Sequence, residues 1–170
     1  NPYPSKSYRD IKIGDIKEEF EKYQGSEHTV VGRIIGWRTH GKLIFADIKD
    51  VTGKIQVIVK EEWLVKGLKD GYLEWNTLDL LDLADFIEVN GEISKSKTGE
   101  ISVLAKSIRL LSKALRPIPR KLKNKEQKFR RRYLDLVINP ERIKLFERKA
   151  LFWQVQRDFL KNEGFMEVEV

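Results

Sequence analysis

Residues 30–59 restrict the possible folds more than any other part of the sequence. They contain three short runs in which every second residue is aliphatic, and turn residues at 41–42 and 50–53 separate the runs. A period of two is typical of a β-strand with one buried face, and Gly- and Asp-containing pairs are typical of hairpin turns. The segment therefore predicts three consecutive antiparallel strands.

The pleat of a strand assigns these side chains to two faces. The second and third strands each have one aliphatic face, formed by Ile44, Ala46, Ile48, Ile55, Val57 and Val59. We expect this face to be the core. Phe45 lies on the other face with Asp47, Lys54 and Gln56, so its ring is a candidate platform for stacking a flat ligand. Single exposed aromatic residues are common, however, and a helix of the same domain covering Phe45 remains an alternative.

The charge balance favours a polyanionic partner, since 33 Lys and Arg residues outnumber 26 Asp and Glu residues. The absence of cysteine and the presence of only two histidines, His28 and His40, predict no metal site and no Ser-His catalytic pair. No apolar run reaches the ~18 residues of a membrane span, and no secretory signal is visible. We therefore expect a cytoplasmic protein without a membrane partner.

The remainder of residues 1–111 completes a barrel. Residues 11–23 predict a helix with Asp15 as its N-cap and Gly25 as its stop. A helix and loop are expected in 60–75, a fourth strand in 86–93, a basic loop in 94–99, and a fifth strand in 101–111 with an irregularity near Lys106. Five strands in this order predict a mainly-β OB-fold, a Greek-key barrel that binds oligonucleotides across strands two and three.

The sequence changes character after residue 111. Residues 112–132 contain two prolines and many cations, which predicts a stiff linker that is either a solvated connector or a track for a polyphosphate. In 133–170, Asn139 and Pro140 predict the start of a long helix that ends at Gly164. Its apolar residues gather on two sides, so we expect one side to bury against its own domain and the other against a partner chain.

Residues 165–170 alternate like the start of a strand. One helix and one strand cannot close a core, so 133–170 is expected to be the beginning of a truncated α+β domain.

Four segments of the chain resemble the N-terminal part of class II (subclass IIb) lysyl-tRNA synthetases. They are IFADIKDVTGKIQVIV (44–59), SKALRPIP (112–119), RRRYLDLVINPE (130–141) and GFMEVEV (164–170). The resemblance extends over nearly the whole chain. It implies that 1–111 is an anticodon-binding OB-fold, and that 133–170 is the first class II motif, whose helix and strand form the homodimer interface of the catalytic domain.

The resemblance also implies roles for individual residues. Phe45 would stack on the central uridine of the anticodon, Gln56 and Glu100 would hydrogen-bond that base, and Arg38 would approach the anticodon strand. Candidates for contact with the phosphate backbone are Lys42, Lys54, Lys95 and Lys97. Candidates for the dimer interface are Ile143, Phe146, Ala150 and Trp153.

The expected function is binding of the tRNA-Lys anticodon loop as part of a lysine-tRNA ligase, which attaches lysine to tRNA with ATP and Mg²⁺. The family's catalytic motifs two and three do not occur in these 170 residues, so we expect this stretch to be non-catalytic and to hold no cofactor. Three alternatives remain open. The first is a free-standing OB module for RNA or single-stranded DNA, and the second is the equivalent region of an aspartyl- or asparaginyl-tRNA synthetase. The third is a purely structural fragment whose stability depends on a partner chain.

Overall fold

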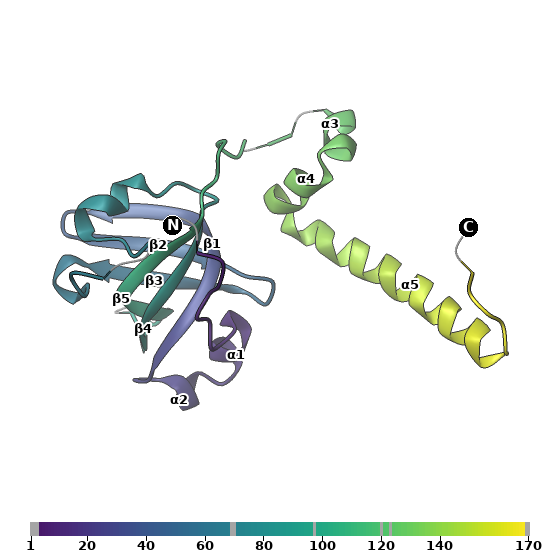
Figure 1. The fold of residues 1–170 in the computed structure, drawn as a ribbon, viewed down its shortest axis with the longest axis horizontal. Helices are drawn as coiled ribbons and strands as arrows, with labels where there is room; N and C mark the ends of the chain where they lie inside the picture. The colour runs from purple at the N-terminus through teal and green to yellow at the C-terminus, as the bar shows by residue number, and fades with distance from the viewer. Residues whose placement is uncertain (1–3, 69–70, 97, 120, 123, 169–170) are drawn as a thin grey trace. The chain divides into compact units, whose positions relative to one another are not determined.

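The computed structural model describes residues 4–68, 71–96, 98–119, 121–122 and 124–168. Its chain divides into two compact units, Asn1–Pro117 and Ile118–Val170. The first unit is the barrel and the second is helical (Figure 1).

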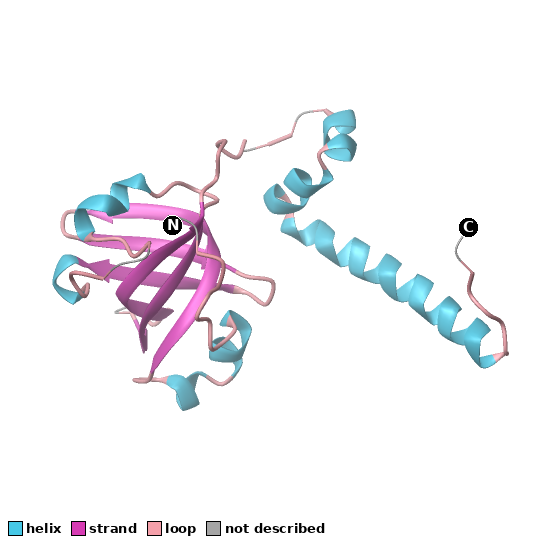
Figure 2. Cartoon of the chain, in the orientation of Figure 1, coloured by secondary structure: helices cyan, strands magenta, loops and turns pink. Residues whose placement is uncertain are grey.

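Five strands form a closed barrel in the order β1-β2-β3-β5-β4 (Figure 2). They are β1 (Glu27–His40), β2 (Leu43–Lys49), β3 (Lys54–Lys60), β4 (Phe86–Lys95) and β5 (Ile101–Ser112). Neighbouring strands are antiparallel except β3 and β5, which are parallel. The five-stranded barrel and both predicted hairpin turns are confirmed.

The aliphatic faces predicted for β2 and β3 are the core faces. All six of their side chains are buried, together with apolar residues of the other strands and of the first helix: Ile44, Ala46, Ile48, Ile55, Val57, Val59, Val30, Ile34, Ile87, Val89, Ile93, Val103, Ala105, Ile108, Ile13 and Ile16. Burying this contiguous apolar surface is the main force that closes the barrel.

Strand β5 contains the predicted irregularity. Asn90 pairs with Ser107 and the next residue, Gly91, pairs with Ala105, so Lys106 is the extra residue of a bulge. Gly91 has no room for a side chain, because a Cβ at this position would lie 2.2 Å from the carbonyl oxygen of Leu104. The backbones of β4 and β5 approach each other closely here because position 91 is glycine.

The predicted N-terminal helix is two short helices, α1 (Ile13–Glu18) and α2 (Phe20–Tyr23). Asp15 is not the N-cap, because it lies inside the first turn of α1 and Lys12 is at the N-cap position. The cap comes from the β2–β3 turn instead. The backbone N–H of Ile13 donates to Asp50 Oδ2 (3.1 Å), and that of Gly14 donates to Thr52 Oγ1 (2.8 Å).

Two 3₁₀ helices, η1 (Glu61–Trp63) and η2 (Trp75–Leu80), connect β3 to β4 in place of the helix predicted in 60–75. The N–H of Leu73 donates to the carbonyl of Ile108 at 2.8 Å. This hydrogen bond holds the connection against β5.

A buried ion pair lies on the outer side of β4 and β5. Arg109 Nη2 is 2.9 Å from Glu88 Oε1, and the two side chains are 4% and 3% exposed. The N-terminal segment covers the pair, because Arg109 donates to the carbonyl of Lys6 (2.8 Å) and the N–H of Tyr8 donates to Glu88 Oε2 (2.6 Å). The guanidinium also stacks near the ring of Tyr72, whose centroid is 5.5 Å away.

The second unit contains α3 (Lys125–Arg130), α4 (Arg132–Ile138), the 3₁₀ helix η3 (Pro140–Arg142) and α5 (Ile143–Asn162). Helix α3 lies in the basic run that follows the stiff segment predicted around Pro117 and Pro119, and the sequence had predicted no helix for this run. Its N-terminus is capped by Asn124, whose Oδ1 accepts from the N–H of Glu126 at 2.8 Å.

The long helix begins with η3 at Pro140, as expected, but Asn139 does not cap it through its side chain. That side chain donates instead to the buried carboxylate of Asp135 at 2.9 Å. The helix ends as predicted at Gly164, which has φ +85° and donates its N–H to the carbonyl of Lys161 at 3.1 Å.

The strand predicted to start at residue 165 does not form in residues 165–168, which have no regular structure. A strand is stable only when another strand satisfies its backbone hydrogen bonds, and none pairs with these four residues. Their alternating sequence therefore remains exposed.

Candidate nucleic-acid interface

The outer face of β1, β2 and β3 brings together three of the four residues predicted to bind the anticodon, Arg38, Phe45 and Gln56. Strand register places Arg38 opposite Phe45 and Phe45 opposite Ile58. One row further along, Asp47 stands opposite Gln56, which in turn stands opposite Ser102 on β5. Glu100 joins this row from the β4–β5 loop. We call Phe45, Gln56, Glu100 and Ser102 the outer-face cluster.

Phe45 points away from the core, as the pleat predicted. Its neighbours Ile44 and Ala46 are buried inside the barrel, whereas its own ring is half-buried on the outer face. The ring of His40 packs edge-on against it, with centroids 6.1 Å apart and an angle of 70°. An aromatic ring on the outer face of a sheet offers a surface on which a flat base can stack.

Hydrogen bonds fix the orientation of the Gln56 amide, which is 7% exposed. Its Nε2 donates to Glu100 Oε2 at 3.0 Å, and its Oε1 accepts from Ser102 Oγ at 3.0 Å. A carboxylate only accepts, so the amide nitrogen must face Glu100. The second N–H of Gln56 and the second oxygen of Glu100 then form an adjacent donor and acceptor.

The loop that carries Glu100 is closed by its own hydrogen bonds. The N–H of Ser96 donates to the carbonyl of Glu100 at 2.8 Å, and the N–H of Glu100 donates to Ser96 Oγ at 3.1 Å. Gly99, with φ +84°, makes the tight turn. These contacts set the height of the exposed Glu100 carboxylate above the sheet.

Arg38 is held by Asp47, with Nη2 and Oδ2 3.1 Å apart. Its side chain is 55% exposed, whereas that of Asp47 is 20% exposed. Gly36 makes room for this carboxylate, because a Cβ at Gly36 would lie 2.7 Å from Asp47 Oδ2. Asp47 thus anchors an exposed cation at the edge of the cluster.

Sequence reasoning did not select Asp47 or Ser102 as site residues. The signal for Asp47 was present, because it shares the alternating face of Phe45. No sequence signal marked Ser102, since its contact with Gln56 arises from the parallel pairing of β3 with β5.

The lysines predicted to contact phosphates are placed at several points around the barrel. Lys42 is 89% exposed in the β1–β2 turn, 3.8 Å from Glu61. Lys54 is exposed at the start of β3. Lys95 ends β4, and its ammonium lies 4.7 Å from the ring centroid of Phe20. Lys97 lies outside the described residues.

The residues predicted to form a dimer interface lie along α5. Ile143 and Trp153 are 39% and 57% exposed, Ala150 is exposed and Phe146 is half-buried. Further apolar side chains on the same helix are also exposed: Leu145, Leu151, Phe152, Val155, Phe159 and Leu160. The amount of exposed apolar surface on one helix is unusual and marks a candidate interaction surface.

Within the described ranges, no group of three or more His, Asp or Glu side chains is arranged to hold a metal ion. Among the helices of these ranges, none combines the length and the apolar character needed to cross a membrane.

The barrel matches a known family model. Residues 28–111 match the tRNA_anti-codon model, described as an OB-fold nucleic acid binding domain. The match starts in β1 and ends in β5, so it contains every residue of the outer-face cluster.

The chain is also similar to curated proteins named lysine–tRNA ligase. It is 42% identical over 158 residues to that of Thermoanaerobacter pseudethanolicus, which covers 91% of this chain and 30% of the relative. It is 37% identical over 177 residues to that of Thermotoga maritima, and 36% identical over 178 residues to that of Thermosipho africanus. Each of these two matches covers 99% of this chain and 34% of the relative. The chain thus spans about a third of the length of these relatives.

Proposed function

Because its barrel belongs to the anticodon-binding family of OB-fold nucleic acid binding domains, and nearly all of the chain is related to lysine–tRNA ligases, we propose that this protein binds the anticodon loop of tRNA-Lys as part of such a ligase. The observation that carries the proposal is the outer-face cluster, in which an aromatic ring lies next to an oriented amide and a carboxylate.

The chemistry of the cluster suits uracil at the centre of the anticodon. Uracil has a π-face, two carbonyl acceptors and one N–H donor. Phe45 supplies a stacking surface, Gln56 supplies an N–H for a carbonyl, and Glu100 supplies an oxygen for the N–H. Cytosine has an amino group and an unprotonated ring nitrogen in place of one carbonyl and the N–H. The N–H of Gln56 and the oxygen of Glu100 would then face groups of the wrong hydrogen-bonding type, so the cluster disfavours cytosine.

Cations around the cluster supply affinity that does not depend on sequence. We assign Arg38, Lys42, Lys54 and Lys95 to contacts with the nucleotide backbone, and Lys97, which lies outside the described residues, to the same role. Arg38 is the best positioned of these residues, because Asp47 holds its guanidinium beside Phe45. Phosphate contacts of this kind release counterions and make binding dependent on salt.

The helical unit supports a second part of the proposal. We assign residues 112–132 to the connection and 133–170 to the beginning of a class II α+β catalytic domain, which dimerises through Ile143, Phe146, Ala150 and Trp153 on α5. The support is the exposed apolar surface of α5, which a second copy of the chain would bury. Concentration-dependent association in sedimentation would support this assignment, and a monomer at high concentration would contradict it.

The reaction of a lysine–tRNA ligase uses ATP and Mg²⁺ to attach lysine to tRNA. The described residues do not fit a magnesium site, since no carboxylate group of the required kind lies among them. We assign no catalytic residue to this stretch, because the catalytic motifs two and three of the family do not occur in it. A cytoplasmic location follows from the proposed role, because the ligase acts where tRNA is used.

The decisive experiment measures binding of the intact chain to a tRNA-Lys anticodon stem-loop. Phe45→Ala removes the stacking surface, so we expect affinity to fall by about 10- to 100-fold, corresponding to roughly 1–3 kcal/mol per base. Phe129→Ala removes a ring that is 60% exposed in the helical unit and serves as the matched control. Its affinity should not change.

A stem-loop with cytidine at the central position tests the reading of that base. The unaltered chain should prefer uridine, and Gln56→Ala should reduce this preference. If Phe45→Ala weakens binding to all RNAs and to single-stranded DNA equally, the barrel is a non-specific module and the proposal is wrong. A tRNA-Asp stem-loop shares the central uridine, so equal binding to it would favour the aspartyl relatives.

A further inference from the structure

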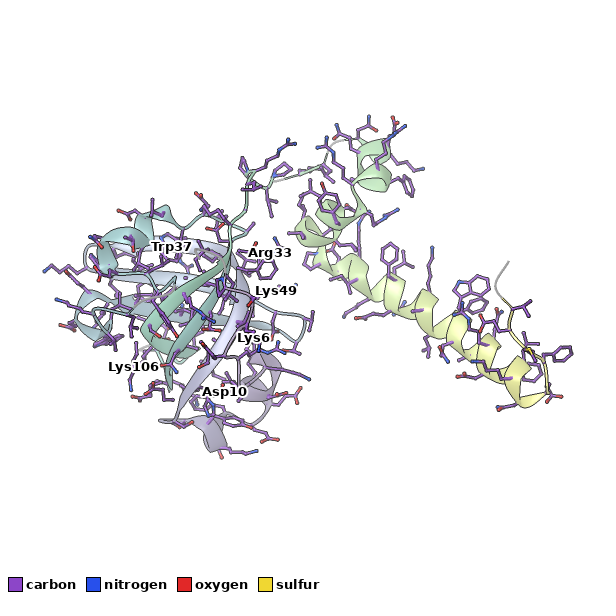
Figure 3. The ribbon with its side chains drawn as sticks, in the orientation of Figure 1. Lys6, Asp10, Arg33, Trp37, Lys49 and Lys106 are labelled. Atoms are coloured by element: carbon purple, nitrogen blue, oxygen red, sulfur yellow. The ribbon has the colours of Figure 1, made fainter. Side chains whose placement is uncertain are left out.

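Three cations lie in one row across adjacent strands on the outer face of the barrel. Register places Arg33 of β1 opposite Lys49 of β2, and Lys49 opposite Lys54 of β3. Cross-strand partners share one face of a sheet, so the three side chains point to the same side. Figure 3 shows Arg33 and Lys49 close together on the β1 side of the barrel. We call these residues the cationic row.

The cationic row runs alongside the outer-face cluster. Lys54 precedes Gln56 by two residues on β3, and Lys49 follows Asp47 by two residues on β2. Two residues along a strand correspond to about 7 Å, and three adjacent strands span about 10 Å. The row is therefore two residues, or about 7 Å, from Gln56 along β3, and it is wide enough for more than one phosphate group.

Protein stability does not explain this arrangement. Like charges at directly opposite positions of a sheet are destabilising. None of the ion pairs between described residues includes Arg33, Lys49 or Lys54, and Asp47, the acidic residue next to the row, is paired with Arg38. The charges of the row are therefore free to bind an external anion.

Arg33 is held in place for this role. Its guanidinium stacks on the ring of Phe86 at 4.3 Å from the centroid, and its Nη1 donates to the carbonyl of Ala84 at 3.3 Å. These contacts use one face and one N–H of a group that has five N–H donors. The remaining donors can bind phosphate oxygens without loss of the stacked position.

We propose that the cationic row binds successive backbone phosphates of the RNA strand whose base is read by Phe45, Gln56 and Glu100. This inference rests on the proposed function and adds to it the path of the backbone, which continues from the cluster across β3, β2 and β1 toward Phe86. The ligand is a phosphodiester strand rather than a single anion, because the three cations are spread across three strands.

The test measures the salt dependence of binding between the intact chain and the tRNA-Lys anticodon stem-loop. For a single strand, each phosphate contact contributes about 0.7 to the slope of log affinity against log salt concentration. We therefore expect Lys49→Gln and Lys54→Gln each to reduce the slope by about 0.7, and the double variant to reduce it by about 1.4. Lys49→Arg combined with Lys54→Arg should retain the original slope.

Lys106→Gln is the matched control. It also removes one positive charge, but Lys106 lies at the β5 bulge, on another side of the barrel from Lys49 (Figure 3). The slope of log affinity against log salt concentration for Lys106→Gln should equal that of the unaltered chain. Circular dichroism of each variant establishes that the barrel is folded, and relief of the like-charge contacts predicts that the Lys49 and Lys54 variants are at least as stable as the unaltered chain.

The outcomes separate the two proposals. An unchanged slope in the double variant, or an equal reduction in Lys106→Gln, would refute the cationic row while leaving the base-reading role in place. If instead Phe45→Ala binds as tightly as the unaltered chain, the proposed function fails independently of the row.

Discussion

Replacement of Glu88 by glutamine tests the role of the buried ion pair with Arg109. Both side chains are at least 96% buried, and Glu88 also accepts the N–H of Tyr8. Glutamine has almost the same shape but no charge, so Glu88→Gln leaves the guanidinium of Arg109 buried without a counterion. Breaking a buried pair in this way typically costs about 3–5 kcal/mol.

The expected change is large enough for a simple unfolding measurement. The barrel unit, Asn1–Pro117, has 117 residues, and an unfolding entropy of about 2.1 cal/mol/K per residue converts each kcal/mol into roughly 4 °C. The predicted fall in Tm is therefore about 12–20 °C. Three of the four tryptophans, Trp37, Trp63 and Trp75, belong to this unit, so fluorescence reports mainly on its unfolding.

A double substitution provides the control. Glu88→Leu combined with Arg109→Met removes both charges and fills the space with apolar atoms, and such exchanges are often neutral or stabilising. We expect the double variant to recover most of the lost Tm. Two results would contradict this reasoning: a Tm of Glu88→Gln within about 3 °C of the unaltered chain, or a double variant that is no more stable than Glu88→Gln. Either result would mean that the loss of Glu88 does not leave Arg109 as a buried charge without a counterion.

Two further predictions concern the turns and strands that shape the barrel. Burial would raise the pKa of Asp50, but hydrogen bonds from the Thr52 hydroxyl and from the N–H groups of Ile13, Thr52 and Gly53 outweigh it and hold the pKa below its usual value of 3.8. A depressed pKa stabilises the fold above the unfolded pKa, and this contribution is lost as the pH falls through the folded pKa. Urea midpoints at pH 7 and pH 3 should therefore differ less in Asp50→Asn than in the unaltered chain. Gly91→Ala should destabilise the barrel by about 3 kcal/mol in the same urea assay, because the new Cβ meets the backbone of β5, and a change below about 0.5 kcal/mol would contradict this.

Whether a sequence prediction was correct depended on how far apart in the chain the interacting residues lie. The core face of β2 and β3 was predictable because alternation is a property of neighbouring residues. The stop at Gly164 was predictable for the same reason, since its positive φ and its hydrogen bonds involve only the last turn of α5. The N-cap of α1 was not predictable, because Asp50 and Thr52 lie almost forty residues away from the N–H groups that they bind.

The same distinction divides the candidate site. Phe45 and Gln56 could be placed on the outer face from the pleat alone, and the family resemblance supplied Glu100 and the role of each residue. The orientation of the Gln56 amide could not be predicted, because it depends on Ser102, 46 residues further along the chain.

By itself, the sequence determined the strands of the barrel, which faces of β2 and β3 are buried and which aromatic ring of these strands is left outside, because a period of two is encoded in adjacent residues. Only the tertiary structure decided which residues share a row across the sheet. The parallel pairing of β3 with β5 aligns Gln56 with Ser102, and bulges in the β1–β2 and β4–β5 hairpins lie between the turns and the pairs Arg33–Lys49 and Glu88–Arg109. The physical reason is that strand register depends on bulges and on pairing between distant segments, and neither is encoded in local spacing.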